Sequence, residues 1–345
     1  MKPMPSPAWL AGAWLLATAL LVAAGVAEGA QGAQDGPAPA ARAATGQVFV
    51  SSEKDDALTA YDAGSGRQLA SWRQCRRPRH LQLSPDRARL YVACSDDHRV
   101  DVVDVATRKT VASLPVGDDP ELFDLSQDGR TLYVSNEEDA LLSAYDTGSG
   151  KRVFAVAVGE EPEGVRVSAD GRHVYVASEV ANLVHVVDVA SRKVVRNIRV
   201  GNRPRRLLLV RGGKELWVSN ELSASVSVIR TDTLEVVQTI AFAPRGMRAE
   251  EVTPVGMAAR SDGSHAYIGL GRANHVAVVE VASRRVQDYV LVGRRAWGLA
   301  LSRDNARLYV ANGLSDDVSV VDTASRKAVA TLRAGRVPHS VAVDD

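Results

Sequence analysis

Apolar residues occupy every second position in short runs along most of this chain. Between residues 163 and 201 the runs are GVRVSADG, HVYVASEV, LVHVVDVA and KVVRNIRVG. Alternation with a period of two is typical of a half-buried β-strand. Gly, Asp, Asn and Ser separate the runs, and these residues favour tight turns. The segment predicts four short antiparallel strands, and the aspartate that ends the third run is expected to bond backbone amides of the next turn.

The four-run unit is repeated along the chain. An aromatic residue followed by Val or Ile marks each copy, at Phe49, Tyr91, Tyr133, Tyr175, Trp217, Tyr267 and Tyr309. A second marker ends a strand in each copy, at Asp62, Asp104, Asp146, Asp188, Arg230, Glu280 and Asp322. Both markers recur every 42 residues, apart from one spacing of 50. Seven concordant copies predict an all-β fold, namely a seven-bladed β-propeller of four-stranded antiparallel blades.

The two ends of the repeat array complement each other. The first copy begins at Gln47 and lacks the strand that precedes every other copy, whereas the chain ends on an extra strand, PHSVAVDD. We therefore expect His339–Val343 to pair with Gln47–Ser51, so that strands from both termini close the ring. Closure removes the free sheet edges that invite aggregation.

Residues 1–27 have the pattern of a secretory signal peptide. Lys2 is their one cation, and an uncharged apolar run follows from Ala8 to Ala27. A positive start, an apolar centre and small residues at the end are typical of such signals. Cleavage after Ala27 or after Ala30 fits this pattern. An uncleaved membrane anchor is the alternative, because about 20 apolar residues can span a bilayer.

After the signal, residues 28–45 predict a flexible leader, and residues 46–345 predict the propeller. The whole chain has 42 Lys and Arg against 41 Asp and Glu. Since Lys2 lies in the signal, the remainder carries 41 − 41 = 0 net charge. A neutral protein is not expected to bind nucleic acid broadly, because such domains are basic. The expected location is the periplasm.

Several segments carry a resemblance to known propellers. LSQDGRTLYVSN, VSADGRHVYVAS and LSRDNARLYVANG resemble the YVTN-type seven-bladed propeller repeat. RPRHLQLSPDRARLYVACSDDHRVDVVD resembles the β-propeller proteins associated with PQQ-dependent alcohol catabolism. The second resemblance implies an exported protein that accompanies a quinone-dependent dehydrogenase and a transport system. From it we expect a non-enzymatic binding or scaffold protein with a periplasmic protein partner of that kind, and no required cofactor.

One set of loops stands out as a candidate site. Each loop precedes the innermost strand of a blade, and six of the seven contain Pro before that strand. The residues after this position are Arg79, Glu121, Glu163, Arg205, Val255, Trp297 and His339. We expect them to rim one mouth of the central channel. They form either a ring of ion pairs, Arg79–Glu121 and Glu163–Arg205, or a ligand site in which guanidinium groups bind a carboxylate and the indole binds a flat ring. PQQ is a candidate for such a planar, carboxylated ligand.

The surroundings of this ring are polarised. The predicted acidic patch comprises Asp118, Asp119, Glu137, Glu138, Glu160, Glu161 and Glu179. The predicted basic arcs comprise Arg76, Arg77, Arg203, Arg206, Arg294, Arg295 and Arg336. The 50-residue spacing reflects an inserted loop, AFAPRGMRAEEVT, in which Phe242 and Met247 are expected to cover part of the channel. Insertions in repeat proteins concentrate on binding faces.

Cys75 and Cys94 are the two cysteines of the chain. If Leu83 pairs with Leu90, Cys94 lies opposite Arg79, and Cys75 is a short loop away. An oxidising compartment favours a disulfide between them. Free thiols or a metal pair with His80 are the alternatives.

Catalytic motifs are absent from the sequence, which has no HExxH, GxSxG or phosphate loop. We therefore predict neither catalytic nor metal-binding residues. Two other functions remain open. A lactonase-like propeller hydrolase would use mouth-facing acids and histidines, and a surface-attached structural propeller would retain its N-terminus.

Overall fold

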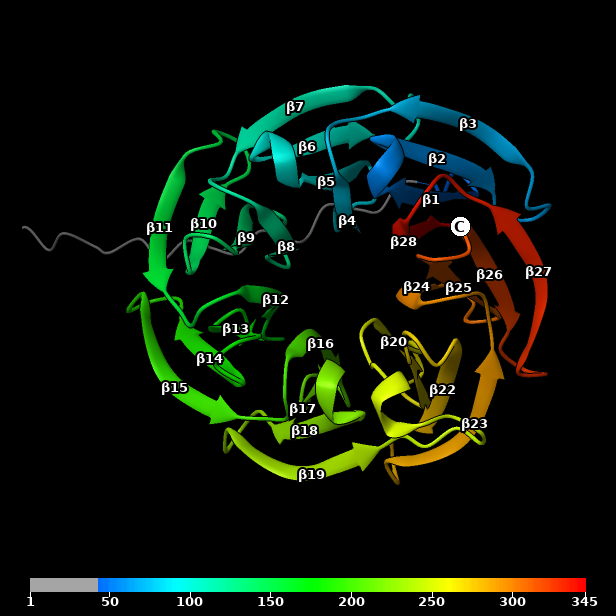
Figure 1. The fold of residues 1–345 in the computed structure, drawn as a ribbon. Helices are drawn as coiled ribbons and strands as arrows, with labels where there is room; N and C mark the ends of the chain where they lie inside the picture. The colour runs from blue at the N-terminus through cyan, green and yellow to red at the C-terminus, as the bar shows by residue number, and fades with distance from the viewer. Residues whose placement is uncertain (1–42) are drawn as a thin grey trace, which may run out of the picture. The chain divides into compact units, whose positions relative to one another are not determined.

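The computed structural model describes residues 43–345, which form seven four-stranded antiparallel sheets arranged in a ring (Figure 1). The predicted seven-bladed β-propeller is therefore confirmed. The predicted signal peptide and most of the predicted leader lie outside the described residues. Within residues 43–345, no helix is long and apolar enough to cross a membrane.

The strands of each blade follow one another along the chain, from the innermost strand to the outermost. The first three blades after the N-terminal strands comprise β4 (Pro78–Leu83), β5 (Arg89–Cys94), β6 (Arg99–Asp104) and β7 (Thr110–Pro115); β8 (Pro120–Leu125), β9 (Thr131–Asn136), β10 (Leu141–Asp146) and β11 (Arg152–Ala157); and β12 (Pro162–Val167), β13 (His173–Ser178), β14 (Leu183–Asp188) and β15 (Lys193–Arg199). The next three comprise β16 (Pro204–Val210), β17 (Glu215–Asn220), β18 (Ser225–Arg230) and β19 (Glu235–Ala241); β20 (Met257–Ala259), β21 (His265–Gly269), β22 (His275–Glu280) and β23 (Arg285–Leu291); and β24 (Ala296–Leu301), β25 (Arg307–Asn312), β26 (Asp317–Asp322) and β27 (Lys327–Arg333). Short 3-10 turns are η1 (Glu53–Asp55), η2 (Ser95–Asp97), η3 (Glu221–Ser223) and η4 (Ala249–Glu251).

The seventh blade joins the two ends of the described chain. Its strand order is β28 (Pro338–Asp344), β1 (Gln47–Ser52), β2 (Ala57–Asp62) and β3 (Gln68–Arg73). Val48 lies opposite Val343, and Val50 lies opposite Val341. The predicted closure of the ring is thus confirmed, and the last strand is innermost in its blade (Figure 1).

The hydrophobic core lies between neighbouring blades. Phe49 of β1 is fully buried and packs in one cluster with Leu90 and Val92 of β5. The same position in the next blade, Tyr91, packs with Phe123 of β8. The repeated aromatic residue therefore fills the space between one blade and the next, which explains why it recurs in every copy.

The second marker residue closes a turn. The Asp188 carboxylate accepts a hydrogen bond from the Ser191 amide at 2.7 Å, and Asp62 accepts one from the Ser65 amide at 2.8 Å. These bonds satisfy backbone groups between the third and fourth strands, as expected for a short polar side chain in a turn. The acidic marker thus has a structural role at these positions.

Cys75 and Cys94 form a disulfide, with their Cα atoms 5.8 Å apart. The predicted bond is confirmed, but the expected register was wrong by one residue. Cys94 lies opposite Pro78 rather than Arg79, because β4 contains an irregularity between Pro78 and Leu81. The disulfide ties the loop before β4 to the end of β5.

Candidate functional site

A strained residue holds each of six loops that enter the innermost strands. Its φ lies between 38° and 61°, in the left-handed region that non-glycine residues adopt at a cost, at Arg77, Asp119, Glu161, Arg203, Arg295 and Val337. The carbonyl of this residue accepts an amide from the segment after the second strand, as in Ser95 to Arg77 at 3.2 Å and Glu221 to Arg203 at 2.9 Å. Neighbouring blades add further bonds, such as the Arg295 amide to the Asn274 side chain at 2.9 Å. The loops are therefore fixed by the fold.

A β-bulge then directs the candidate residues. In β4 the pairing with β5 skips from Pro78 to Leu81, and the innermost strands β8, β12, β16 and β24 skip in the same way. Bulges bend a strand and re-aim its side chains. The residue that follows is packed closely against the next blade: a side chain at Gly298 would collide with the carbonyl of His339.

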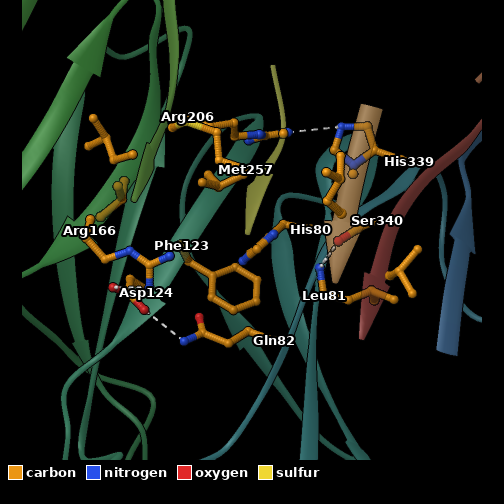
Figure 2. A pocket seen from close by; sticks show the side chains of 17 residues that line it. His80, Leu81, Gln82, Phe123, Asp124, Arg166, Arg206, Met257, His339 and Ser340 are labelled. Atoms are coloured by element: carbon orange, nitrogen blue, oxygen red, sulfur yellow. Dashed lines mark hydrogen bonds and ion pairs between the residues drawn. The ribbon is translucent and has the colours of Figure 1, made fainter. Parts of the chain in front are cut away.

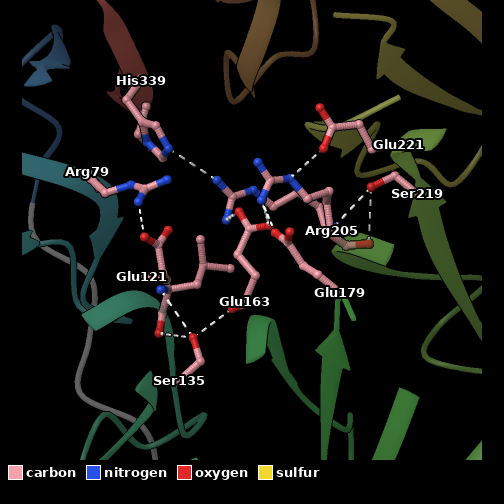
Figure 3. A network of polar contacts seen from close by, with 12 residues as sticks. Arg79, Glu121, Ser135, Glu163, Glu179, Arg205, Ser219, Glu221 and His339 are labelled. Atoms are coloured by element: carbon pink, nitrogen blue, oxygen red, sulfur yellow. Dashed lines mark hydrogen bonds and ion pairs between the residues drawn. The ribbon is translucent and has the colours of Figure 1, made fainter. Parts of the chain in front are cut away.

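The structure places the predicted ring inside the channel. Its members Arg79, Glu121, Glu163, Arg205, Trp297 and His339 are all buried, with exposed fractions from 1% to 8%. Figure 3 shows the charged members and His339 converging on one network. The predicted pairs Arg79–Glu121 and Glu163–Arg205 both form, and they are buried away from bulk solvent.

Arg205 is the centre of the larger half of this network. Its guanidinium lies 2.8 Å from Glu163 and 3.1 Å from Glu221, and it also donates to Glu179 (Figure 3). Arg206 lies 3.0 Å from the second oxygen of Glu163. Burial raises the pKa of Glu163, but Arg205 and Arg206 outweigh it and hold that pKa below its ordinary value. Glu163 is therefore ionised at neutral pH.

Arg79 is the centre of the other half. It donates to Glu121, and its Nε lies 3.8 Å from Glu53. Burial lowers the pKa of Arg79 to about 10, so the guanidinium is still charged at neutral pH. Arg77 adds a second cation, 3.7 Å from Glu121 and 3.4 Å from Asp119.

Three glutamates of the network were not recognised in the sequence as members of the site. Glu53, Glu179 and Glu221 follow the second strand of their blades, and Glu179 had been assigned to the acidic patch. The structure instead buries Glu179 against Arg203, at 2.6 Å, and Arg205. A signal was available, because a glutamate occurs at residues 53, 137, 179 and 221, in register with the 42-residue repeat.

Five other residues of the predicted acidic patch line a groove. Asp119, Glu137, Glu138, Glu160 and Glu161 line about 390 Å³ of space. Burial, and then the nearby Asp119, raise the pKa of Glu137. Asp119, Glu121 and Glu137 bring carboxylate oxygens within 4.8 Å of one another. Arg77 and Arg79 neutralise part of this charge, since Arg77 lies 3.4 Å from Asp119 and Arg79 pairs with Glu121.

A cavity of about 180 Å³ lies at the mouth, beside this network. Its lining residues are Glu53, Arg77, Arg79, Arg205, Arg295, Trp297, Gly313, Val337, Pro338 and His339. The guanidinium groups of Arg295 and Arg205 lie 4.2 Å and 5.1 Å from the centre of a Trp297 ring. The indole is therefore a support for two cations, which is a cation–π arrangement.

Two buried donors of this cavity have no partner among the described residues. The indole Nε1 of Trp297 is one, and Nδ1 of His339 is the other. Arg206 donates to Nε2 of His339 at 3.4 Å, and a guanidinium has no lone pair to offer. Nδ1 of His339 therefore carries the proton, and both orphan atoms are N–H groups that require an acceptor.

We expect His339 to make the protein less stable in mild acid. Burial, and then Arg79 and Arg206, hold the pKa of His339 well below 6.5, and His80 stands nearby. At pH values between that folded-state pKa and about 6.5, His339 is protonated in the unfolded chain but neutral in the folded protein. Stability is therefore full above about pH 6.5 and falls by up to about 1.4 kcal/mol per pH unit below it.

Urea unfolding at pH 7.5, 6.5 and 5.5 checks this expectation, with His339→Gln as the informative variant. The variant should lose part of the acid sensitivity of the native protein. His173→Gln, at a half-buried position in β13, should keep the native pH dependence. Identical pH profiles for native protein and His339→Gln would contradict the assignment of a buried neutral imidazole.

The inserted loop does not contribute Phe242 to the channel. Phe242 is buried in the core cluster with Val226 and Ile240, and Met247 is on the surface. The expectation that Phe242 covers the channel was wrong, because the loop turns this ring back between two blades. The exposed part of the insertion is held by Arg248, whose backbone amide donates to Glu251 at 2.9 Å.

Comparison with known proteins bears on this geometry. A model of the family described as "Lactonase, 7-bladed beta-propeller" matches residues 190–344. This part of the chain is similar to the lactonase propellers. It contains the ring members Arg205, Val255, Trp297 and His339, whereas Arg79, Glu121 and Glu163 lie outside the match. No curated protein is similar enough to the chain to count as a match.

Solved structures resemble the chain in fold. A putative 6-phosphogluconolactonase from Bacteroides fragilis has a TM-score of 0.73 at 15% identity, covering 87% of this chain and 98% of that one. Kuenenia stuttgartiensis hydrazine synthase has a TM-score of 0.68 at 22% identity, covering 76% and 88%. Dihydro-heme d1 dehydrogenase NirN, in complex with DHE, has a TM-score of 0.67 at 16% identity, covering 89% and 77%. Identities this low establish the propeller fold alone.

Proposed function

We propose that this protein is an exported, non-enzymatic propeller that binds a small carboxylate at the mouth of its channel. One observation carries the proposal: the mouth cavity is lined mainly by hydrogen-bond donors, two of which are buried and unpartnered. Four guanidinium groups and the N–H groups of Trp297 and His339 face a single lining carboxylate, Glu53. Charge-assisted bonds from arginine suit carboxylates because the guanidinium fork matches their two oxygens.

The same atoms argue against general-base catalysis at His339. A general base needs a free lone pair within reach of the proton that it removes. The lone pair of His339 is directed to Arg206, at 3.4 Å, and its other nitrogen is a donor. His339 is therefore suited to bind an oxygen rather than to activate water.

We place this binding function in a periplasmic system for quinone-dependent alcohol oxidation or the associated transport. The support is the export pattern of residues 1–27, the Cys75–Cys94 disulfide, which is typical of oxidising compartments, and the sequence resemblance. A protein partner such as the dehydrogenase or a transport component would recognise the loaded mouth. Affinity capture from periplasm with the mature protein as bait would test the partner.

PQQ is our candidate ligand, because it carries carboxylates on a planar ring. One carboxylate-bearing edge would enter the mouth cavity of about 180 Å³, and the rest of the ring would lie outside it. Trp297 is not free to stack on PQQ, since two guanidinium groups already lie over the indole. We therefore expect the arginines to bind the carboxylates, with Trp297 holding Arg295 and Arg205 in place. A bound quinone would still quench Trp297, one of three tryptophans after residue 27.

Titration with PQQ, followed by calorimetry and by absorption-corrected fluorescence, tests the proposal. Arg295→Met should weaken binding about tenfold or more, because a hydrogen bond to a charged group contributes about 1.5–3 kcal/mol. Arg294→Met is the matched control, since this neighbour is exposed and does not line the cavity. No heat and no specific quenching up to about 100 µM, where binding near −5 to −6 kcal/mol is detectable, would exclude PQQ. Citrate and succinate, titrated in the same way, test carboxylate binding itself.

Lactone hydrolysis is the second candidate function. The family model that matches residues 190–344 and the lactonase fold neighbour favour it. Glu121 is the carboxylate that we would test as base, because its Oε2 has no hydrogen-bond partner while Arg79 holds its Oε1. A panel of γ- and δ-lactones, assayed with and without divalent metal, separates the two functions. Turnover that disappears in Glu121→Gln would favour the enzyme over the binding protein.

A further inference from the structure

A second cavity lies in the channel, beyond the mouth. It has a volume of about 240 Å³ and is lined by innermost strands of all seven blades (Figure 2). We call it the inner chamber, and its polar lining residues are His80, Gln82, Asp124, Arg166, Arg206, His339 and Ser340. His339 lines both cavities. Pockets for drug-sized ligands have about 300–1,000 Å³, so the inner chamber suits a smaller molecule.

The charges of the inner chamber are paired. Arg166 lies 3.5 Å from Asp124, and Arg206 lies 3.0 Å from Glu163. Burial, and then Arg206 and Arg166, lower the pKa of His80 well below its ordinary value, so this imidazole is neutral at pH 7. The inner chamber thus differs from the mouth, where donors predominate.

Gln82 leaves an unpaired acceptor in the inner chamber. Its side-chain nitrogen donates to Asp124 at 2.8 Å, and a carboxylate can only accept, so the orientation of the amide is determined. The Gln82 carbonyl oxygen is then buried without a partner. Figure 2 shows the bond from the Gln82 nitrogen to Asp124.

Unpaired donors lie in the same cavity. Nε of Arg166 is buried without a hydrogen-bond partner, although the same guanidinium reaches Asp124. His80 has no hydrogen-bond partner among residues 43–345 and packs edge-on against Phe123, with ring centres 4.8 Å apart. Phe123 and Met257 supply an apolar wall (Figure 2). A donor, an acceptor and a flat apolar wall therefore surround one space of limited size.

We propose that the inner chamber binds a small, uncharged, planar molecule that carries a carboxamide or lactam group. Such a group offers an N–H to Gln82 and a carbonyl to Arg166 or His80, so it satisfies both kinds of orphan atom. A carboxylate would leave the Gln82 oxygen unsatisfied and facing a negative charge. An ammonium ion would leave the Arg166 and His80 donors unsatisfied. The proposal uses atoms beyond the mouth and stands independently of the proposed function.

Benzamide is the test probe, with benzoate and benzylammonium as charged analogues of the same ring. Ligand-detected NMR on the mature protein should show saturable benzamide binding with a Kd of about 1 mM or tighter, and weaker binding of both ions. Gln82→Met should weaken benzamide at least about fivefold. Gln127→Met is the matched control, because Gln127 is exposed and outside the cavity. This variant should bind benzamide with the affinity of the native protein.

The proposal would be overturned by the absence of saturable benzamide binding, by tighter binding of benzoate than of benzamide, or by native affinity in Gln82→Met. Met257→Phe is a second variant, in case Gln82→Met fails to fold. It narrows the inner chamber without removing a polar group. Benzamide affinity should fall there too, and native affinity would equally contradict the site. Arg295→Met should leave the affinity for benzamide unchanged. The proposal for the mouth and the proposal for the inner chamber can therefore be rejected separately.

Discussion

Removing residues 337–345 is expected to abolish cooperative unfolding of the ring. The deletion removes β28, all of whose residues are buried, and leaves one edge of β1 unpaired. Val341 and Val343 leave the core cluster that they share with Val48 and Val50. Burying one such side chain contributes about 1.5–3 kcal/mol, so two approach the about 5–15 kcal/mol that stabilises a whole protein. Asp344 is lost as well, and with it the Arg87 contact at 3.0 Å to the next blade.

Urea unfolding followed by circular dichroism and by fluorescence checks this result. A circular permutant that joins residue 345 to residue 43 and opens the turn at Ser191 keeps every strand while changing the order of the chain. It should unfold cooperatively, near the native midpoint, because ring closure is a property of strand pairing. A truncated protein that melts like the full chain would refute the closure argument.

Replacing Glu163 with Gln is expected to destabilise the folded protein by about 3–5 kcal/mol, the usual cost of removing one partner of a buried ion pair. Glu163 is 1% exposed and faces Arg205 at 2.8 Å and Arg206 at 3.0 Å. Gln has nearly the same shape, so the effect reports the lost charge rather than lost packing. The guanidinium groups of Arg205 and Arg206 would then lose the carboxylate that neutralises both of them in a buried site.

The free energy of unfolding of Glu163→Gln, measured in urea at pH 7.5, tests this prediction. Glu160→Gln is the matched control, since Glu160 is exposed on the neighbouring loop and should change stability by less than about 0.5 kcal/mol. The double variant Glu163→Gln with Arg206→Met should recover part of the loss, because it restores the charge balance, and such coupling is expected of residues in contact. Glu163→Gln within experimental error of native stability would mean that the network does not stabilise the ring.

The blade pattern was readable in the sequence because strand alternation and turn chemistry are local. Phe49 and the aromatic residues in register with it predicted one buried position per blade, and all lie in the core between blades. The seven copies also predicted β28 from a strand missing at one end and present at the other. Even the disulfide followed, since the loop and strand that carry Cys75 and Cys94 belong to one hairpin.

The sequence predicted which residues meet at the site, but not how deeply they are buried. The positions of Arg79, Glu121, Glu163 and Arg205 in the repeat predicted that they would meet. Their burial was not predictable, because it depends on bulges that displace each residue from simple alternation. Alternation also could not show that Glu179 is paired with Arg205 instead of lying on the acidic surface, since that contact joins residues of two blades.

The sequence by itself determined the number of blades, the order of the strands and the closure of the ring, because these depend on a periodicity that every copy repeats. Only the tertiary structure decided how the ring residues are used. Seven innermost strands bring side chains from residues far apart in sequence into one channel, where the predicted ion pairs are buried. The same convergence forms the mouth and the inner chamber. Trp297 and His339 come from two blades, and so do Gln82 and Arg166, so neither set of unpaired atoms can be seen in one copy of the repeat.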